Sequence, residues 1–118
     1  MHTQNLQVLA TDTSHALASG ACRIFWHSFR EVTGAAGAVY KLTDGNAPGA
    51  KILLTVSLNT NESTRDWFGT HGLEAEDSVY FLLVSGQVEG NVQTVLEDEY
   101  QADVARVMSA LNQGISAI

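Results

Sequence analysis

Hydrophobic and polar residues alternate along much of the chain, which is the pattern of strands that bury one face. Between residues 51 and 58, the even positions are aliphatic and the odd positions are polar, with Leu53 as the exception. Residues 38–43 alternate in the same way. An Asp-Gly dipeptide and Pro48-Gly49 lie between these segments, and both dipeptides favour turns. The stretch therefore predicts a β-hairpin with a long tip.

Five further segments have the composition of short strands. In residues 79–84, VYFLLV, both faces would be apolar, so this strand is predicted either to be covered on both sides or to meet another subunit. Seven short strands separated by turn signals predict an all-β protein, a small antiparallel β-sandwich or jelly roll over residues 1–98. The five further segments are residues 6–10, 22–30, 64–68, 78–85 and 92–97.

The last twenty residues change to a helical period, which predicts a helix over residues 99–113 within a C-terminal helix and tail, residues 99–118. Asp98 and Gln101 resemble a capping box, and Gly114 favours a helix end. A helix of this length is marginal alone in water, so its apolar stripe is expected to pack on its own sandwich or on a neighbouring molecule. The stripe consists of Val104, Val107, Met108 and Leu111.

Charge and composition narrow the classes of partner. The chain of 118 residues carries 13 acidic and 6 basic residues, a formal net charge of −7. Because nucleic acids and anionic membranes bind clustered cations, neither is an expected partner. Cys22 is the single cysteine, so no intrachain disulfide can form. No signal-peptide pattern and no segment of transmembrane length is present in the sequence, so assembly in a cytoplasm is expected.

No sequence pattern indicates catalysis. The four histidines lack metal-ligand spacing, and the acidic residues within 74–77 lack the glycine-punctuated loop of a calcium site. Ser85 is not in a nucleophile elbow, and the turn at residues 45–49 lacks the lysine and the helix of a phosphate-binding loop. We therefore expect no enzyme activity, no catalytic residue, no metal site and no cofactor.

Three aromatic residues lie in the predicted strand at residues 22–30. Strict alternation places Phe25, His27 and Phe29 on one face and Trp26 on the other. One of these faces must belong to the core. The other is expected to be covered by the C-terminal helix, to contact another subunit or to provide a platform on which sugars stack.

Six segments follow one another in a recognisable order. A strand that opens Gly-x-x-Arg is followed by a glycine-rich turn, a strand ending in Asp-Gly, an aliphatic strand, another glycine turn and a strand rich in Tyr and Leu. This order resembles a group of small β-sandwich structural proteins of tailed bacteriophage virions. The matching segments are residues 20–25, 33–37, 42–45, 52–58, 69–73 and 79–84.

The resemblance implies a structural virion protein that assembles in the bacterial cytoplasm, and above all a capsid decoration (cement) protein that stabilises the head shell. A head–tail connector, tail or fibre component is an alternative, and a carbohydrate- or receptor-binding module is an alternative of another class. The implied partners are copies of the chain itself, as a trimer, and the major capsid protein or other virion proteins. The expected interface residues are Phe25, His27, Phe29, Tyr80, Leu82, Val107, Met108 and Leu111.

Overall fold

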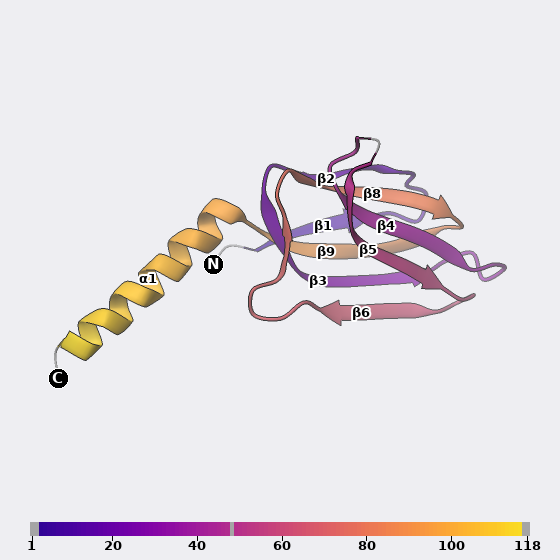
Figure 1. Ribbon diagram of the computed structural model, residues 1–118. Helices are drawn as coiled ribbons and strands as arrows, with labels where there is room; N and C mark the ends of the chain where they lie inside the picture. Colours follow the sequence, from indigo (N-terminus) through magenta and orange to yellow (C-terminus); the bar gives the residue numbers. More distant parts are fainter. Residues whose placement is uncertain (1–2, 48, 117–118) are drawn as a thin grey trace.

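The computed structural model describes residues 3–47 and 49–116, which form two packed antiparallel sheets and one C-terminal helix (Figure 1). The predicted all-β sandwich with a C-terminal helix is confirmed. One sheet has the order β1-β9-β3-β6, with β7 pairing with β3, and the other has the order β2-β8-β4-β5. The elements are β1 (Gln4–Val8), β2 (His15–Ser19), β3 (Cys22–Glu31), β4 (Ala38–Asp44), β5 (Lys51–Leu58), β6 (Ser63–Trp67), β7 (Leu73–Ala75), β8 (Ser78–Ser85), β9 (Val88–Leu96) and α1 (Glu97–Ser116).

The core lies between the two sheets and is rich in aromatic rings. Phe29 comes from one sheet, while Tyr40 and Phe81 come from the other, and all three are buried. The ring centroids of Phe29 and Tyr40 lie 4.6 Å apart, and the rings of Phe29 and Phe81 are nearly parallel at 6.0 Å. Aromatic rings bury large areas and favour such offset contacts, so this cluster joins the two layers.

A β-bulge in β3 corrects the predicted alternation of its aromatic residues. Ile24 pairs with Thr94 and Trp26 pairs with Gln93, so Phe25 is an extra residue without a partner in β9. The inward-facing positions therefore change from even numbers before the bulge to odd numbers after it. As a result Phe25 and Phe29 do not share one environment, because Phe25 is half-buried and Phe29 lies in the core.

A glycine allows the two central strands of this sheet to pack closely. Gly90 in β9 pairs with Phe29 in β3, and a Cβ atom at Gly90 would lie 2.0 Å from the carbonyl oxygen of Ser28. A side chain at this position would collide with the backbone of β3. Glycine at residue 90 is therefore required by the packing of the sheet.

Seven strands were predicted, and the described residues form nine. The seven predicted segments correspond to β1, β3, β4, β5, β6, β8 and β9, with shifts of a few residues at their ends. The two additional strands are the short β2 and β7, which pair with β8 and β3. The predicted hairpin joins β4 to β5, and Pro48, expected in its tip, lies outside the described residues.

Helix α1 begins at Glu97, directly after β9, and projects away from the sandwich (Figure 1). It therefore begins two residues before the predicted start at residue 99, so Asp98 lies in the first turn and not at the cap. It also continues past Gly114 to Ser116, so the predicted helix end at Gly114 is wrong. The molecule extends 63 Å along its longest axis and 29 Å and 18 Å along the others.

Candidate functional site

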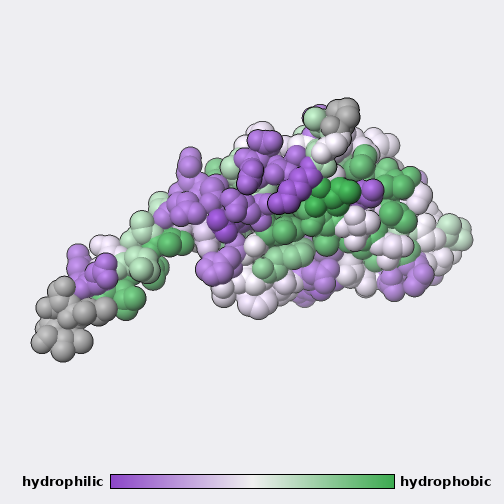
Figure 2. Space-filling model, viewed as in Figure 1, coloured by the Kyte–Doolittle hydropathy of each residue, from purple (hydrophilic) through white to green (hydrophobic). Residues whose placement is uncertain are grey.

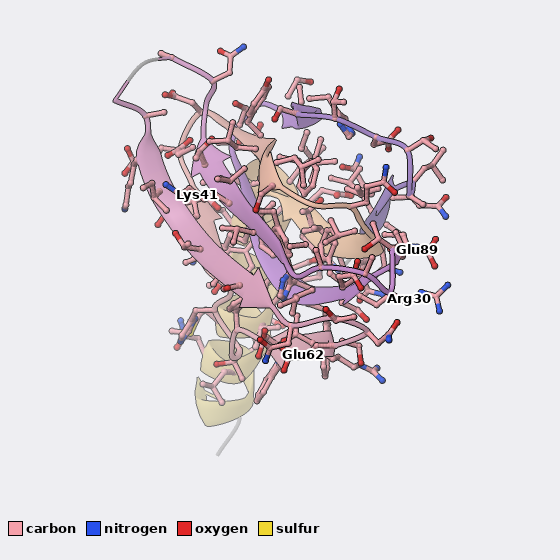
Figure 3. All side chains as sticks on the ribbon, turned by 90° about the vertical axis from the view of Figure 1, so that its right-hand side faces the viewer. Arg30, Lys41, Glu62 and Glu89 are labelled. Carbon is pink, nitrogen blue, oxygen red and sulfur yellow. The ribbon has the colours of Figure 1, made fainter. Side chains whose placement is uncertain are left out.

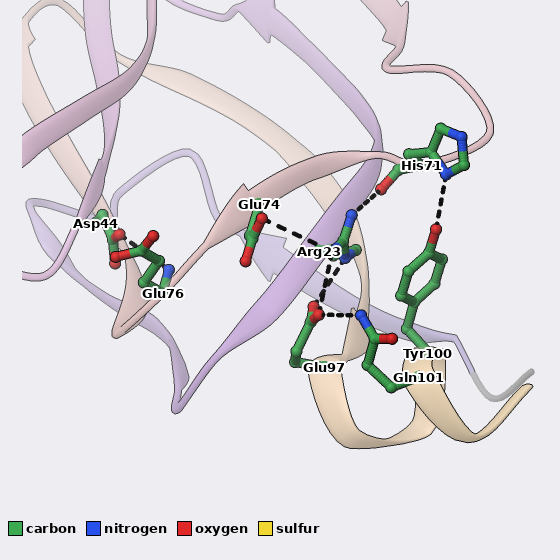
Figure 4. A network of polar contacts seen from close by, with 8 residues as sticks. All are labelled: Arg23, Asp44, His71, Glu74, Glu76, Glu97, Tyr100 and Gln101. Carbon is green, nitrogen blue, oxygen red and sulfur yellow. Dashed lines mark hydrogen bonds and ion pairs between the residues drawn. The ribbon is translucent and has the colours of Figure 1, made fainter. Parts of the chain in front are cut away.

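The base of helix α1 is attached to the sandwich by a polar network around Arg23 of β3 (Figure 4). The guanidinium donates from Nε and Nη2 to the two carboxylate oxygens of Glu97, at 2.8 and 3.1 Å. It also donates to the backbone oxygen of His71 at 3.0 Å and lies 4.2 Å from the ring centre of Tyr100. A bidentate pair with a cation–π contact defines an orientation as well as a distance. Arg23 thus sets the direction in which the helix leaves the sheet.

The charges of this network reinforce each other. The hydrogen bond to Glu97 raises the pKa of Arg23 above its usual value. In turn, the hydrogen bonds from Arg23 and Gln101 lower the pKa of Glu97. Tyr100 completes the attachment, since its hydroxyl lies 2.8 Å from Nδ1 of His71 and its ring contacts Phe25. The first turn of α1 is therefore part of the folded sandwich.

Beyond this first turn, the apolar stripe of α1 is exposed. Val107 exposes 66% and Leu111 56% of their surface, and Met108 is more than half exposed. Figure 2 shows apolar surface along the part of the helix that projects from the sandwich. Val107 and Met108, with Tyr100 and His71, also line a depression of about 460 Å³ between the helix and the loop before β7. The expectation that the stripe packs on its own sandwich is correct only for the end next to Tyr100.

A second apolar surface lies on the outer face of the β2-β8-β4-β5 sheet. Ile52, Leu82 and Val84 are exposed there, and Figure 2 shows apolar side chains gathered over β4, β5 and β8. Tyr80 and Leu82 line a depression of about 410 Å³ beside the tip of the β4–β5 hairpin. Strand β8 is therefore not covered on both sides by its own chain, so the first of its two interpretations is wrong, and contact of its outer face with another subunit stays a prediction.

Two of the expected interface residues belong to the core. His27 and Phe29 are buried inside the sandwich, so the expectation that they contact another molecule is wrong. The bulge in β3 is the reason, because it turns both side chains inward. Phe25 is half-buried and its ring packs against that of Tyr100 in α1, so it helps to attach the helix to the sandwich. The expected residues that do lie at the surface are Tyr80, Leu82, Val107, Met108 and Leu111.

Among the histidines that the structure describes, His27 is the one that is buried, and its ring connects three strands. Its Nε2 atom is hydrogen-bonded to the hydroxyl of Tyr40. Its Nδ1 atom lies 3.2 Å from a carboxylate oxygen of Asp66 but is not aligned for a hydrogen bond. Burial lowers the pKa of His27, and Asp66 opposes this shift. Tyr40 is buried and its pKa is raised by burial, so it is no nucleophile at neutral pH, and the cluster stabilises the core.

Two carboxylates hold loops and are thereby unavailable as proton carriers near neutral pH. Glu31 accepts hydrogen bonds from the backbone of Asn61, Thr33 and Gly34, which lower its pKa to about 2. Asp44 accepts hydrogen bonds from the backbone amides of residues 76–78. Burial raises the pKa of Asp44, but these hydrogen bonds outweigh it, so the pKa lies below its usual value. Within residues 3–47 and 49–116, no three His, Cys, Asp or Glu side chains gather as a metal site would require.

The outer face of the β1-β9-β3-β6 sheet has a different character. Trp26 and Trp67 are cross-strand neighbours on β3 and β6 and expose 37% and 56% of their surface. Arg65 lies over the ring of Trp26 at 5.2 Å. The sequence indicated that Trp26 lies on the face opposite to Phe29. Its contact with Trp67 was missed because it depends on the register between two strands that are distant in the sequence.

Comparisons with known proteins add no assignment. No family model matches the chain, and neither a curated protein nor a solved structure matches it significantly. Among the described residues, no helix is both long and apolar enough to cross a membrane.

Proposed function

We propose that the protein is a capsid decoration protein of a tailed bacteriophage, which associates with copies of itself and with the head shell. The observation that carries this proposal is the apolar stripe that α1 holds away from the sandwich, with Val107 and Leu111 more than half exposed. Exposed apolar surface of this kind marks an interaction site. The phage particle itself is taken from the resemblance in strand and turn order.

The spacing along α1 favours a second copy of the same helix as the occupant of the stripe. Tyr100, Val104, Val107 and Leu111 follow one another at steps of four, three and four residues, which is the heptad spacing of a coiled coil. Residues 107–118 contain no charged side chain that would repel another copy. Burying each large aliphatic side chain contributes about 1.5–3 kcal/mol, less the cost of immobilising the molecules. We assign three copies to the assembly, as the resemblance to cement proteins implies.

Helix-mediated association would leave the sandwiches free to contact the shell. The outer face of the β2-β8-β4-β5 sheet offers apolar side chains, including Ile52 and Leu82. The exposed residues Glu76 and Asp77 lie at the β7–β8 turn and contribute to the net charge of −7. A basic patch on the shell protein would complement this charge, and the attraction would weaken as salt is added.

The first test separates self-association from folding. We expect Val107→Asp and Leu111→Asp to convert the oligomer into monomers in sedimentation experiments, because a charge in a buried seam lacks a partner. The matched control is Ser109→Asp on the exposed opposite side of the same helix, which should leave the oligomer intact. A wild-type protein that sediments as a monomer at tens of micromolar would contradict the assembly role.

The second test addresses the particle. Quantitative mass spectrometry of purified virions should find many copies per particle, and purified protein should bind empty head shells. Particles without the protein should lose heat resistance. A few copies per particle, or binding to tails and not to shells, would assign the chain to the connector, tail or fibre and would overturn the cement proposal.

A further inference from the structure

Two indole rings form an exposed platform on the outer face of the β1-β9-β3-β6 sheet. Trp26 and Trp67 have ring centroids 6.3 Å apart and planes inclined by 32°, so the two indoles form one apolar cluster on this face. The guanidinium of Arg65 lies over the ring of Trp26, 5.2 Å from its centroid, so it covers one face of this indole, and Trp67 is the more exposed of the two rings. Exposed tryptophans are costly in water, whereas flat apolar faces beside polar groups are well suited to ligands that have both characters.

The strand register continues this platform into a row of amides and hydroxyls. Gln93 pairs with Trp26, and Asn91 pairs with Ser28 in the next outward-facing row. Beyond them, β1 adds Asn5 opposite Gln93 and Gln7 opposite Asn91. Amide side chains donate and accept hydrogen bonds, and neutral groups of this kind suit a ligand rich in hydroxyls better than they suit a charged one.

The face is hollowed along this row. One depression of about 360 Å³ is lined by residues that include Trp26, Ser28, Asn91 and Gln93. A second, of about 340 Å³, is lined by residues that include Ser28, Asn91 and Gln7. Because both depressions share Ser28 and Asn91, they form one shallow trough. The ion pair of Arg30 and Glu89 belongs to the lining of the second depression, and Figure 3 labels these two neighbouring side chains.

We propose that this trough and the adjoining indole of Trp67 bind an oligosaccharide, with one sugar ring stacked on Trp67 beside Trp26 and the amides of Gln93 and Asn91 bonded to the hydroxyls. The C–H face of a pyranose ring is apolar and its rim carries hydroxyl groups, which matches an indole platform flanked by amides. Two connected depressions suit a chain of linked sugars. The site lies on the sheet opposite to the apolar face of Ile52 and Leu82, so it is independent of the proposed contact with a shell.

Tryptophan fluorescence can be used to measure binding at this site. Trp26 and Trp67 are its only two tryptophans, so intrinsic tryptophan fluorescence reports on the trough alone. We would titrate the protein with oligosaccharides of hexoses, N-acetylhexosamines and acetylated hexoses, chosen from binding to an immobilised panel. At least one should change the fluorescence and protect the indoles from quenching by acrylamide. Trp67→Ala and Gln93→Ala should each weaken panel binding about tenfold or more.

Controls separate this inference from folding and from the proposed assembly. Leu82→Ala, on the opposite sheet, should leave saccharide affinity unchanged, and circular dichroism melting of each variant excludes loss of the fold. If Trp67→Ala proves unstable, Gln93→Ala alone decides. Val107→Asp should abolish self-association without changing the affinity of a single site. The inference is overturned if no saccharide of the panel binds, if binding survives both trough variants, or if Trp67→Ala changes only the oligomer size.

Discussion

The sandwich and helix α1 use their apolar residues differently. Inside the sandwich, Tyr40 and Phe81 are completely buried by residues of the same chain. On α1, Val107 and Leu111 expose more than half of their surface. The two regions meet at Arg23, whose contacts include only the first turn of the helix. The difference indicates that the sandwich is stable by itself, whereas helix α1 beyond its first turn would gain stability from the proposed assembly.

The largest expected effect comes from removing a core ring. Phe81→Ala should lower the free energy of unfolding by about 3–5 kcal/mol, because it removes buried surface and leaves a cavity beside Phe29 and Tyr40. Urea unfolding followed by circular dichroism measures this loss. Leu111→Ala is the matched variant on α1, and under conditions where the protein is monomeric it should cost well under 1 kcal/mol. Equal losses in both variants would contradict the division into two regions.

The junction is the next element to test. Arg23→Ala should destabilise the protein by about 1.5–3 kcal/mol, because Glu97 would lose a charged, largely buried hydrogen-bond partner. The control is Arg106→Ala, since Arg106 also pairs with a carboxylate, that of Asp103, but on the exposed surface of α1. Its loss should cost under about 0.5 kcal/mol. A similar small effect for Arg23 would show that the helix is not attached through this network.

The response to pH should also differ between the two regions. Burial lowers the pKa of His27 in the folded state, so below about pH 6.5 the unfolded chain binds a proton that the folded chain does not. The free energy of unfolding should therefore fall as the pH decreases, by up to about 1.4 kcal/mol per pH unit. The stabilising carboxylates of Glu31, Asp44 and Glu97 have lowered pKa values, so their contribution is lost only below about pH 4.5.

Urea unfolding between about pH 7.5 and pH 5.5 isolates the histidine effect. His27→Gln should flatten the pH dependence in this range, whereas His15→Gln, a substitution of a partly exposed histidine, should retain it. Sedimentation of the wild-type protein should change little, because no charged residue lies between Val107 and the last residue of the chain. A pH dependence that persists in His27→Gln would assign it to another group.

The smallest effect is expected on the outer face of the four-stranded sheet. Ile52→Ser should change the free energy of unfolding by no more than about 0.5 kcal/mol, because Ile52 is half exposed and lies outside the core. Binding to head shells should nevertheless weaken if this face meets the shell. A stability loss as large as that of a core variant would show that the side chain is packed in the folded monomer.

The sequence predicted the elements that depend on local pattern. Alternation located β4 and β5, the apolar run located β8, and the helical period located α1. The features it missed arise between distant segments. Strand β7 has only three residues and exists because it pairs with Cys22–Ile24. The bulge at Phe25 likewise cannot be predicted from the two-residue alternation of a strand. It nevertheless determines that His27 faces Tyr40 and that Trp26 faces Trp67.

The two proposed surfaces differ in how far the sequence could have located them. The stripe on α1 was found by its period, because neighbouring turns of one helix bring its residues together. The trough required three strands in register, since Trp67, Trp26 and Gln93 come from β6, β3 and β9. A site made of residues from three strands can be predicted only when the pairing of these strands is known.

The position of β9 has a consequence for the synthesis of this chain. It is the last strand to be made, yet it lies between β1 and β3. During translation β1 and β3 have no partner for one of their edges until residue 96 has emerged, and unpaired edges promote aggregation. Chains that terminate before β9 should therefore be cleared or should aggregate. Folding late and as one unit would suit the proposed role in an assembly of many copies, because incomplete chains would not fold and so would not be incorporated.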